Sequence, residues 1–166
     1  KGLDYLIDSM RIISKTVPNV KLIIAGEGKI DCQIKSSEDI EVINKLLTNH
    51  EIIKLIKKSK VVVCPYTSAS QSGIPMVAYL FKKPIVATNV GDFPIVIDNM
   101  KTGIIVPPKD SISLANAIIE ILINNDLHKS LQDNIEFKYS ETNLTWDKIA
   151  EKTITVYEAI NTTPSK

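Results

Sequence analysis

Apolar residues recur along the chain at two spacings, and the spacing switches several times. The first apolar residues stand three or four positions apart, which predicts an amphipathic helix over 3–13 that ends before Pro18. The next apolar stretches, at 20–26 and 40–44, are short and rich in β-branched residues, as strands are. The segment 29–39 between them is polar and fits neither period.

The alternation continues to the end of the chain. Thr48-Asn49-His50-Glu51 has the form of a capping box that opens a helix. Three consecutive valines in the next strand, 60–66, predict a central parallel strand with Val61–Val63 buried on both faces. The remaining elements are predicted as a helix at 74–82, a strand at 84–89, a short element at 92–99, a strand at 103–106, a helix capped by Asp110, and helices around 127–137 and 146–160.

Strands that alternate with helices are typical of an α/β fold. We expect a doubly wound, Rossmann-like parallel sheet with helices on both faces. Ligands of such sheets bind outside the carboxyl ends of the strands, so every loop that follows a strand is a candidate site. These loops lie at 26–29, 44–48, 65–73 and 89–93.

Composition narrows the class of protein. The 166 residues, 44% of them hydrophobic, suit one soluble globular domain. No apolar run approaches the roughly 20 residues that cross a bilayer, and no signal peptide is recognised. A net charge of +1 without a basic stripe argues against a nucleic-acid partner. Cys32 and Cys64 have no recognisable pairing pattern, so we interpret them as reduced thiols of a cytoplasmic protein.

The stretch "PYTSASQSGIP" at 65–75 offers hydroxyls, an amide and a glycine but no charge. It enters a predicted helix, whose first N–H groups suit an anion. Gly73 lets a phosphate approach the backbone, Ser70 and Ser72 can donate, and the lack of a repelling carboxylate favours a pyrophosphate. The alternative is an ordinary connection whose serines only cap the next helix.

Two other kinds of site are not supported. His50 and His128 are far apart in sequence and have no acidic or cysteine companion, so no metal site is predicted. Ser70 and Ser72 lack the Gly-x-Ser-x-Gly elbow that a nucleophilic serine uses in one large class of hydrolases.

An ordered set of motifs covers nearly the whole chain: "KG", "LIIAGEG", "VVVCPY", "QSGIPMVAYLFKKPIVAT", "VGDFP" and "TGIIVPPKD". In this order they resemble the C-terminal, donor-binding domain of a family 4 retaining glycosyltransferase with the two-domain GT-B fold. The resemblance implies that 1–166 is a single donor-binding domain. It also implies a fragment that lacks the N-terminal Rossmann-like domain and the first strand of this one, consistent with an opening without Met.

The resemblance assigns site residues by position. Lys1 matches a lysine that reaches the donor diphosphate, and its partner arginine would lie upstream. The other expected diphosphate contacts are Ser70, Gln71, Ser72, Gly73 and Ile74, and the base contacts are Asn44, Lys45 and Leu46. Gly26-Glu27-Gly28 matches the glycine turn near the donor. Alternatively, Lys1 is a disordered end, and Glu27 and Lys45 are solvated surface charges. No catalytic residue is assigned.

The chain departs from the family pattern at its acids. Two glutamates eight positions apart would fall at Ala69 and Val77, or at Ser70 and Ala78, and neither pair is acidic. Ile95 stands where a further glutamate is common. The acids of the usual ribose contact and of a glutamate role at the donor sugar are therefore absent from these positions, although the "QSG" form resembles a branch of the family and does not imply loss of activity.

The expected reaction is retaining transfer of a hexose from a nucleoside diphosphate sugar to a glycan or lipid-linked acceptor, as in polysaccharide or lipopolysaccharide biosynthesis. The resemblance implies no metal or other cofactor. It also implies an acceptor bound mainly by the missing domain, an inactive isolated fragment, and a cytoplasmic location. Association with the inner face of the cell membrane is left open. One alternative is a catalytically degenerate nucleotide-binding or interaction module. A GT-B sugar-nucleotide epimerase is less favoured, because its acids and histidine are not evident.

Overall fold

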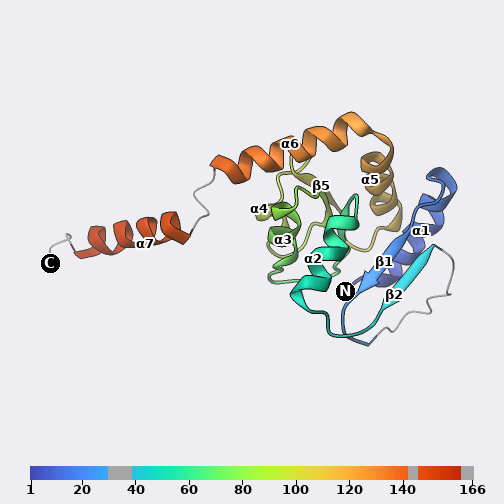
Figure 1. The fold of residues 1–166 in the computed structure, drawn as a ribbon, viewed down its shortest axis with the longest axis horizontal. Coiled ribbons are helices and arrows are strands. Elements are labelled where there is room, and N and C mark those ends of the chain that lie inside the picture. The colour runs from blue at the N-terminus through green and yellow to red at the C-terminus, as the bar shows by residue number, and fades with distance from the viewer. Residues whose placement is uncertain (30–38, 142–145, 162–166) are drawn as a thin grey trace.

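A computed structural model describes residues 1–29, 39–141 and 146–161 (Figure 1). The helices are α1 (Leu3–Thr16), α2 (Asn49–Lys58), α3 (Ile74–Leu80), α4 (Phe93–Val96), α5 (Ser111–Ile123), α6 (Asn125–Glu141) and α7 (Trp146–Asn161). The strands are β1 (Leu22–Ala25), β2 (Ile40–Ile43), β3 (Val62–Cys64), β4 (Ile85–Thr88) and β5 (Gly103–Val106). This order matches the predicted alternation, and Cys32 falls outside the described residues.

Two helix starts form as their sequences predict. At α2, the Thr48 hydroxyl accepts the N–H of Glu51 at 3.3 Å, and the Glu51 carboxylate accepts the N–H of Thr48 at 2.9 Å. At α5, one carboxylate oxygen of Asp110 accepts the N–H groups of Ile112 and Ser113 at 3.0 and 2.9 Å. Each bond satisfies a donor that the helix itself leaves free.

The central strand of the larger sheet is β4. It pairs in parallel with β3 on one side and β5 on the other. All four β4 residues are buried, and their side chains alternate between two cores. Val86 packs into the core of α1 and α5, whereas Ile85 and Ala87 pack into the core of α3 and α6. The predicted α/β fold with helices on both faces is therefore confirmed.

Val61–Val63 were predicted as a central parallel strand buried on both faces; among the described residues β3 is parallel as predicted, but it is neither central nor fully buried. Strand β3 begins at Val62 and is paired only with β4 among the described residues. Val61, Val62 and Val63 are half-buried, and only Cys64 is fully buried. A run of β-branched residues indicates burial, but it does not show whether a strand has a neighbour on both sides.

Strands β1 and β2 form a separate two-stranded parallel sheet. Within the described part of the chain, β1 has a paired neighbour only at β2, so β1 and β3 each leave one edge open. Both sheets nevertheless pack on the same helices, because Leu22 of β1 and Val63 of β3 contact the core of α1 and α5. The sheets therefore act as two parts of one layer.

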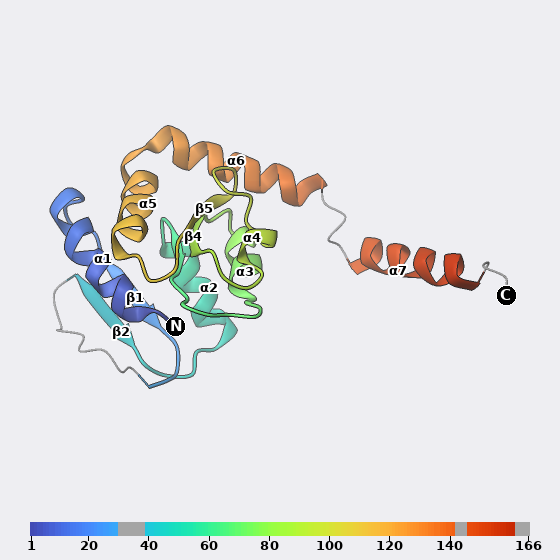
Figure 2. The same cartoon turned by 180° about the vertical axis from the view of Figure 1, so that it is seen from behind.

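The helices α1 and α5 lie side by side in both overall views (Figures 1 and 2). Helix α7 stands apart from the sheets in the same views and exposes Ile154 and Tyr157. The side chain of Trp146, at the start of this helix, is not among those described. Among the described helices, none combines the length and apolarity that a bilayer span requires.

Candidate functional site

The start of the chain packs against the carboxyl end of β3. Gly2 is the N-cap of α1 and has a left-handed backbone with φ of 74°. A Cβ at Gly2 would lie 1.9 Å from the carbonyl oxygen of Pro65, so only glycine fits so close to this loop. The Lys1 ammonium lies 5.3 Å from the centroid of the Tyr66 ring, within the range of a cation–π contact. Lys1 therefore has a partner next to the predicted diphosphate loop.

Tyr66 is itself held on two sides. Its ring centroid lies 5.3 Å from that of Phe93, which is fully buried, and the ring planes are tilted by 59°. The backbone carbonyl of Tyr66 accepts a hydrogen bond from the Thr88 hydroxyl at 2.5 Å. Sequence reasoning did not single out Tyr66, although its position directly after a strand could have done so.

The predicted diphosphate loop, 70–74, is partly committed to internal bonds. The N–H of Ser72 donates to Oδ2 of Asp92, and the N–H of Ile74 donates to the Ser72 hydroxyl, both at 3.4 Å. The N-cap of α3 is Gly73, which makes no side-chain cap, and the Ser72 hydroxyl, one position earlier, accepts the first N–H of the helix, so the simpler interpretation is met only in part. Ser70, Gln71 and Gly73 are exposed. A phosphate would meet these three residues rather than the whole loop.

The structure corrects one premise about this loop, because an acid does lie against it. Asp92 comes from the turn after β4, and its Oδ1 is buried with no hydrogen-bond partner among the described residues. Its neighbour Gly91 has φ of 58°, and a Cβ there would lie 2.7 Å from the carbonyl oxygen of Ala69. The sequence had marked 89–93 as a candidate loop but gave no role to Asp92.

The glycine turn and the predicted base loop also meet. The N–H of Gly26 donates to the carbonyl of Ile43 at 3.1 Å, and the N–H of Gly28 donates to Oδ1 of Asn44 at 3.2 Å. Gly26 and Gly28 have φ of 141° and 155°, and Glu27 is exposed. These bonds join the two predicted segments into a second group of site residues at the carboxyl ends of β1 and β2.

The side chain of Lys45 belongs to the start of α2. Its ammonium lies 2.6 Å from Oε1 of Glu51. The hydrogen bond from Lys45, followed by those from Thr48, lowers the pKa of Glu51 from 4.5 to about 2. The simpler interpretation of Lys45 as a surface charge is thus favoured for its side chain. Leu46, beside it, is 78% exposed.

The positions of the missing glutamates carry no acid in the sequence. Ile95 is 82% exposed on α4. Within the described ranges, no group of three or more His, Cys, Asp or Glu side chains is placed to hold a metal ion. His128 lies 3.1 Å from the Lys60 carbonyl through Nε2. Burial raises the pKa of the Cys64 thiol to about 12, which keeps it protonated and unreactive.

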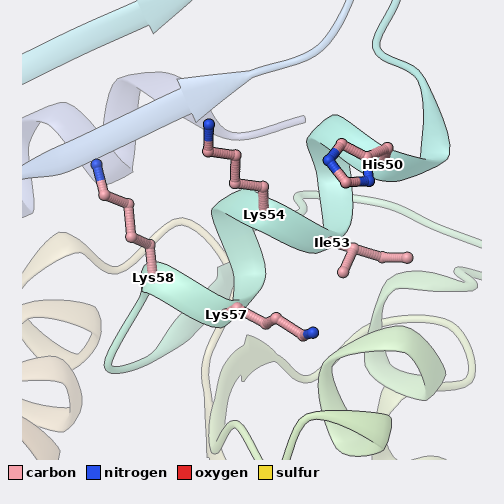
Figure 3. A pocket seen from close by; sticks show the side chains of 5 residues that line it. All are labelled: His50, Ile53, Lys54, Lys57 and Lys58. Carbon is pink, nitrogen blue, oxygen red and sulfur yellow. The ribbon is translucent and has the colours of Figure 1, made fainter.

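A hollow of about 510 Å³ lies on α2 and is lined by His50, Ile53, Lys54, Lys57 and Lys58 (Figure 3). Lys54 and Lys58 extend from one side of the helix, and Ile53 and Lys57 from the other. Lys57 is engaged with the ring of Phe81, 5.0 Å from its centroid. The hollow contains none of the predicted donor-site residues, and a single helix lines it. We therefore do not take it as the site.

Comparison with known proteins shows the family and the fold of the chain. The family model "Glycosyl transferases group 1" matches residues 1–124, and the chain belongs to this family. It has the fold of the C-terminal domain of a GT-B glycosyltransferase. The C-terminal domain of a group 1 glycosyltransferase, LpcC, from Francisella tularensis superposes with a TM-score of 0.73 at 19% identity, over 85% of this chain and 79% of that one.

Two relatives share about a quarter of the sequence, and a further solved structure shares the fold at lower identity. An uncharacterized glycosyltransferase of Methanocaldococcus jannaschii, MJ1607, is 27% identical over 95% of this chain and 42% of its own length. The phosphatidyl-myo-inositol mannosyltransferase of Mycobacterium leprae is 27% identical over the whole chain and 45% of its own length. HepE of Anabaena, in complex with UDP-glucose, has a TM-score of 0.73 at 19% identity over 85% of this chain and 41% of that one. The chain thus spans less than half the length of these relatives.

Proposed function

We propose that the chain is the donor-binding half of a retaining hexosyltransferase that takes a sugar from a nucleoside diphosphate sugar. The observation that carries this proposal is the meeting of Lys1 with the loop 65–74 at the carboxyl end of β3. Family membership supports sugar transfer, and HepE, which shares the fold, binds UDP-glucose. The phosphatidyl-myo-inositol mannosyltransferase relative supports a glycan or lipid-linked acceptor, as in polysaccharide or lipopolysaccharide biosynthesis.

The chemistry follows from the charges at the site. As the bond between sugar and diphosphate breaks, negative charge grows on the diphosphate, and the Lys1 ammonium stabilises it. The N–H of Gly73 and the side chains of Ser70 and Gln71 bind phosphate oxygens. Backbone groups of 44–46 hold the base. These donors take the place of a metal ion, so binding requires no magnesium. Separately, the proposed location of the reaction is the cytoplasmic side of the cell membrane.

The rest of the protein completes both the cleft and the sheet. An N-terminal Rossmann-like domain binds the acceptor, and one strand before α1 fills the space between β1 and β3. Two facts support this strand. Both strands leave an edge open, and Gly2 places the start of α1 at the carboxyl end of β3. A strand that runs parallel to β3 and turns into α1 must end at this edge of the sheet.

The direct test is an NMR titration of the chain with UDP and with GDP, both without magnesium. We expect weak binding, with amide shifts concentrated at 44–46 and 70–74. If neither nucleotide shifts the amides of 70–74 at millimolar concentration, the loop is only a connection and the proposed donor site fails. Addition of magnesium to each titration tests the metal independence separately.

A second candidate is a degenerate module that binds a nucleotide without chemistry. The absence of acids at Ala69, Ser70, Val77 and Ala78 favours it. An assay of donor turnover by the full-length protein distinguishes the transferase from the degenerate module. Donor binding without transfer or hydrolysis would support the degenerate module, and measurable transfer would exclude it.

A further inference from the structure

Asp92 is the one acid that touches the proposed donor loop through a hydrogen bond described in the structure. Its Oδ2 accepts the N–H of Ser72 at 3.4 Å, across 20 positions of sequence. The turn that carries it is pressed against the loop, because Gly91 lies directly beside the carbonyl oxygens of Ala69 and Ser70. Phe93, on the other side of Asp92, supports the Tyr66 ring on which the Lys1 ammonium lies. One short segment therefore contacts both the donor loop and the ring on which the Lys1 ammonium lies.

The orientation of the carboxylate explains how an acid is tolerated at an anion site. One oxygen faces a backbone donor, and the other is buried away from solvent. A buried carboxylate oxygen without a donor is unfavourable, so packing alone does not account for an aspartate here. The two loop bonds, each 3.4 Å long, are at the weak end of the hydrogen-bond range.

We infer that Asp92 is a positioning residue for the donor loop. It takes the N–H of Ser72 and so fixes the backbone with Ser70, Gln71 and Gly73 turned outward to the diphosphate. The inference rests on the proposed function but adds to it a residue that acts through the loop without touching the donor.

Two substitutions separate this role from a direct contact. Asp92→Asn keeps an oxygen that can accept the N–H of Ser72 and removes the charge, so UDP affinity should stay within about threefold of wild type or rise. Asp92→Ala removes the acceptor, and UDP affinity should fall about tenfold, as expected for one lost hydrogen bond. Asp133→Asn, an exposed site on α6, controls for the loss of one negative charge elsewhere.

A spectroscopic measurement tests the contact itself. The amide proton of Ser72 should move farther from its wild-type position in Asp92→Ala than in Asp92→Asn, because only the asparagine retains an acceptor. If it moved no farther in Asp92→Ala, the inference would be overturned. The same follows if Asp92→Ala binds UDP as wild type does, or if it weakens UDP-glucose while UDP is unchanged, which would mean a direct sugar contact. Absence of UDP binding by the wild type would instead overturn the proposed function, and the inference with it.

Discussion

Gly2 lies so close to Pro65 that a Cβ on the glycine would stand 1.9 Å from the proline carbonyl oxygen. This contact fixes the start of α1 to the end of β3. Gly2→Ala should therefore lower the melting temperature, because a left-handed backbone costs alanine about 1–2 kcal/mol before the clash is counted. Gly73→Ala is the matched control, since a Cβ there meets nothing within 4 Å. Equal melting temperatures for the two variants would contradict the close contact between Gly2 and Pro65.

Two valines at different depths in the sheet should differ in how much stability is lost when each is replaced by aspartate. Val86 of β4 is fully buried, whereas Val62 of β3 is half-buried. Val86→Asp should unfold the protein, because a buried unpaired charge costs several kcal/mol, on the order of a domain's whole stability of about 5–15 kcal/mol. Val62→Asp should destabilise it less. Urea unfolding followed by circular dichroism measures both, and a Val86→Asp protein as stable as wild type would refute β4 as the core strand.

Features that depend on neighbours in sequence were predictable, and those that depend on distant partners were not. The caps at Thr48 and Asp110 are local, so their sequences reveal them. The edge position of β3 depends on which strands flank it, and three valines carry no such information. The rule for parallel sheets identified the loop of Asp92 but not its bond to Ser72, which requires two separate loops to meet.

The start of α2 should respond to acid. The folded pKa of Glu51 is about 2, below its ordinary 4.5, so its ionised form stabilises the folded state. That stabilisation is complete above pH 4.5 and is lost as pH falls toward 2. Glu51→Gln should flatten this part of the dependence of stability on pH. Carboxyl NMR titration of Glu51 measures the pKa directly, and a value near 4.5 would disprove the contacts with Lys45 and Thr48.

The apolar surface of the last helix predicts self-association. Ile154 and Tyr157, three positions apart on α7, are 54% and 65% exposed. Such surface favours contact with a second copy of the chain. Sedimentation velocity should show mass increasing with concentration, and the double substitution Ile154→Asp with Tyr157→Ser should abolish the increase. A monomer at every concentration would mean that this face does not associate.

A substitution at Gly73 should weaken UDP binding without changing the stability of the fold. Its backbone, with φ of −78°, suits any residue, and a Cβ there projects into open space. Gly73→Val should therefore leave the melting temperature unchanged while its branched side chain occupies the place of the diphosphate. UDP affinity should fall at least about tenfold by NMR titration, the equivalent of one lost hydrogen bond or more. Ser68→Ala, at an exposed position outside 70–74, should bind as wild type does. If Gly73→Val bound UDP as tightly as Ser68→Ala, the diphosphate would have to lie elsewhere, because no ligand could share that space with the valine.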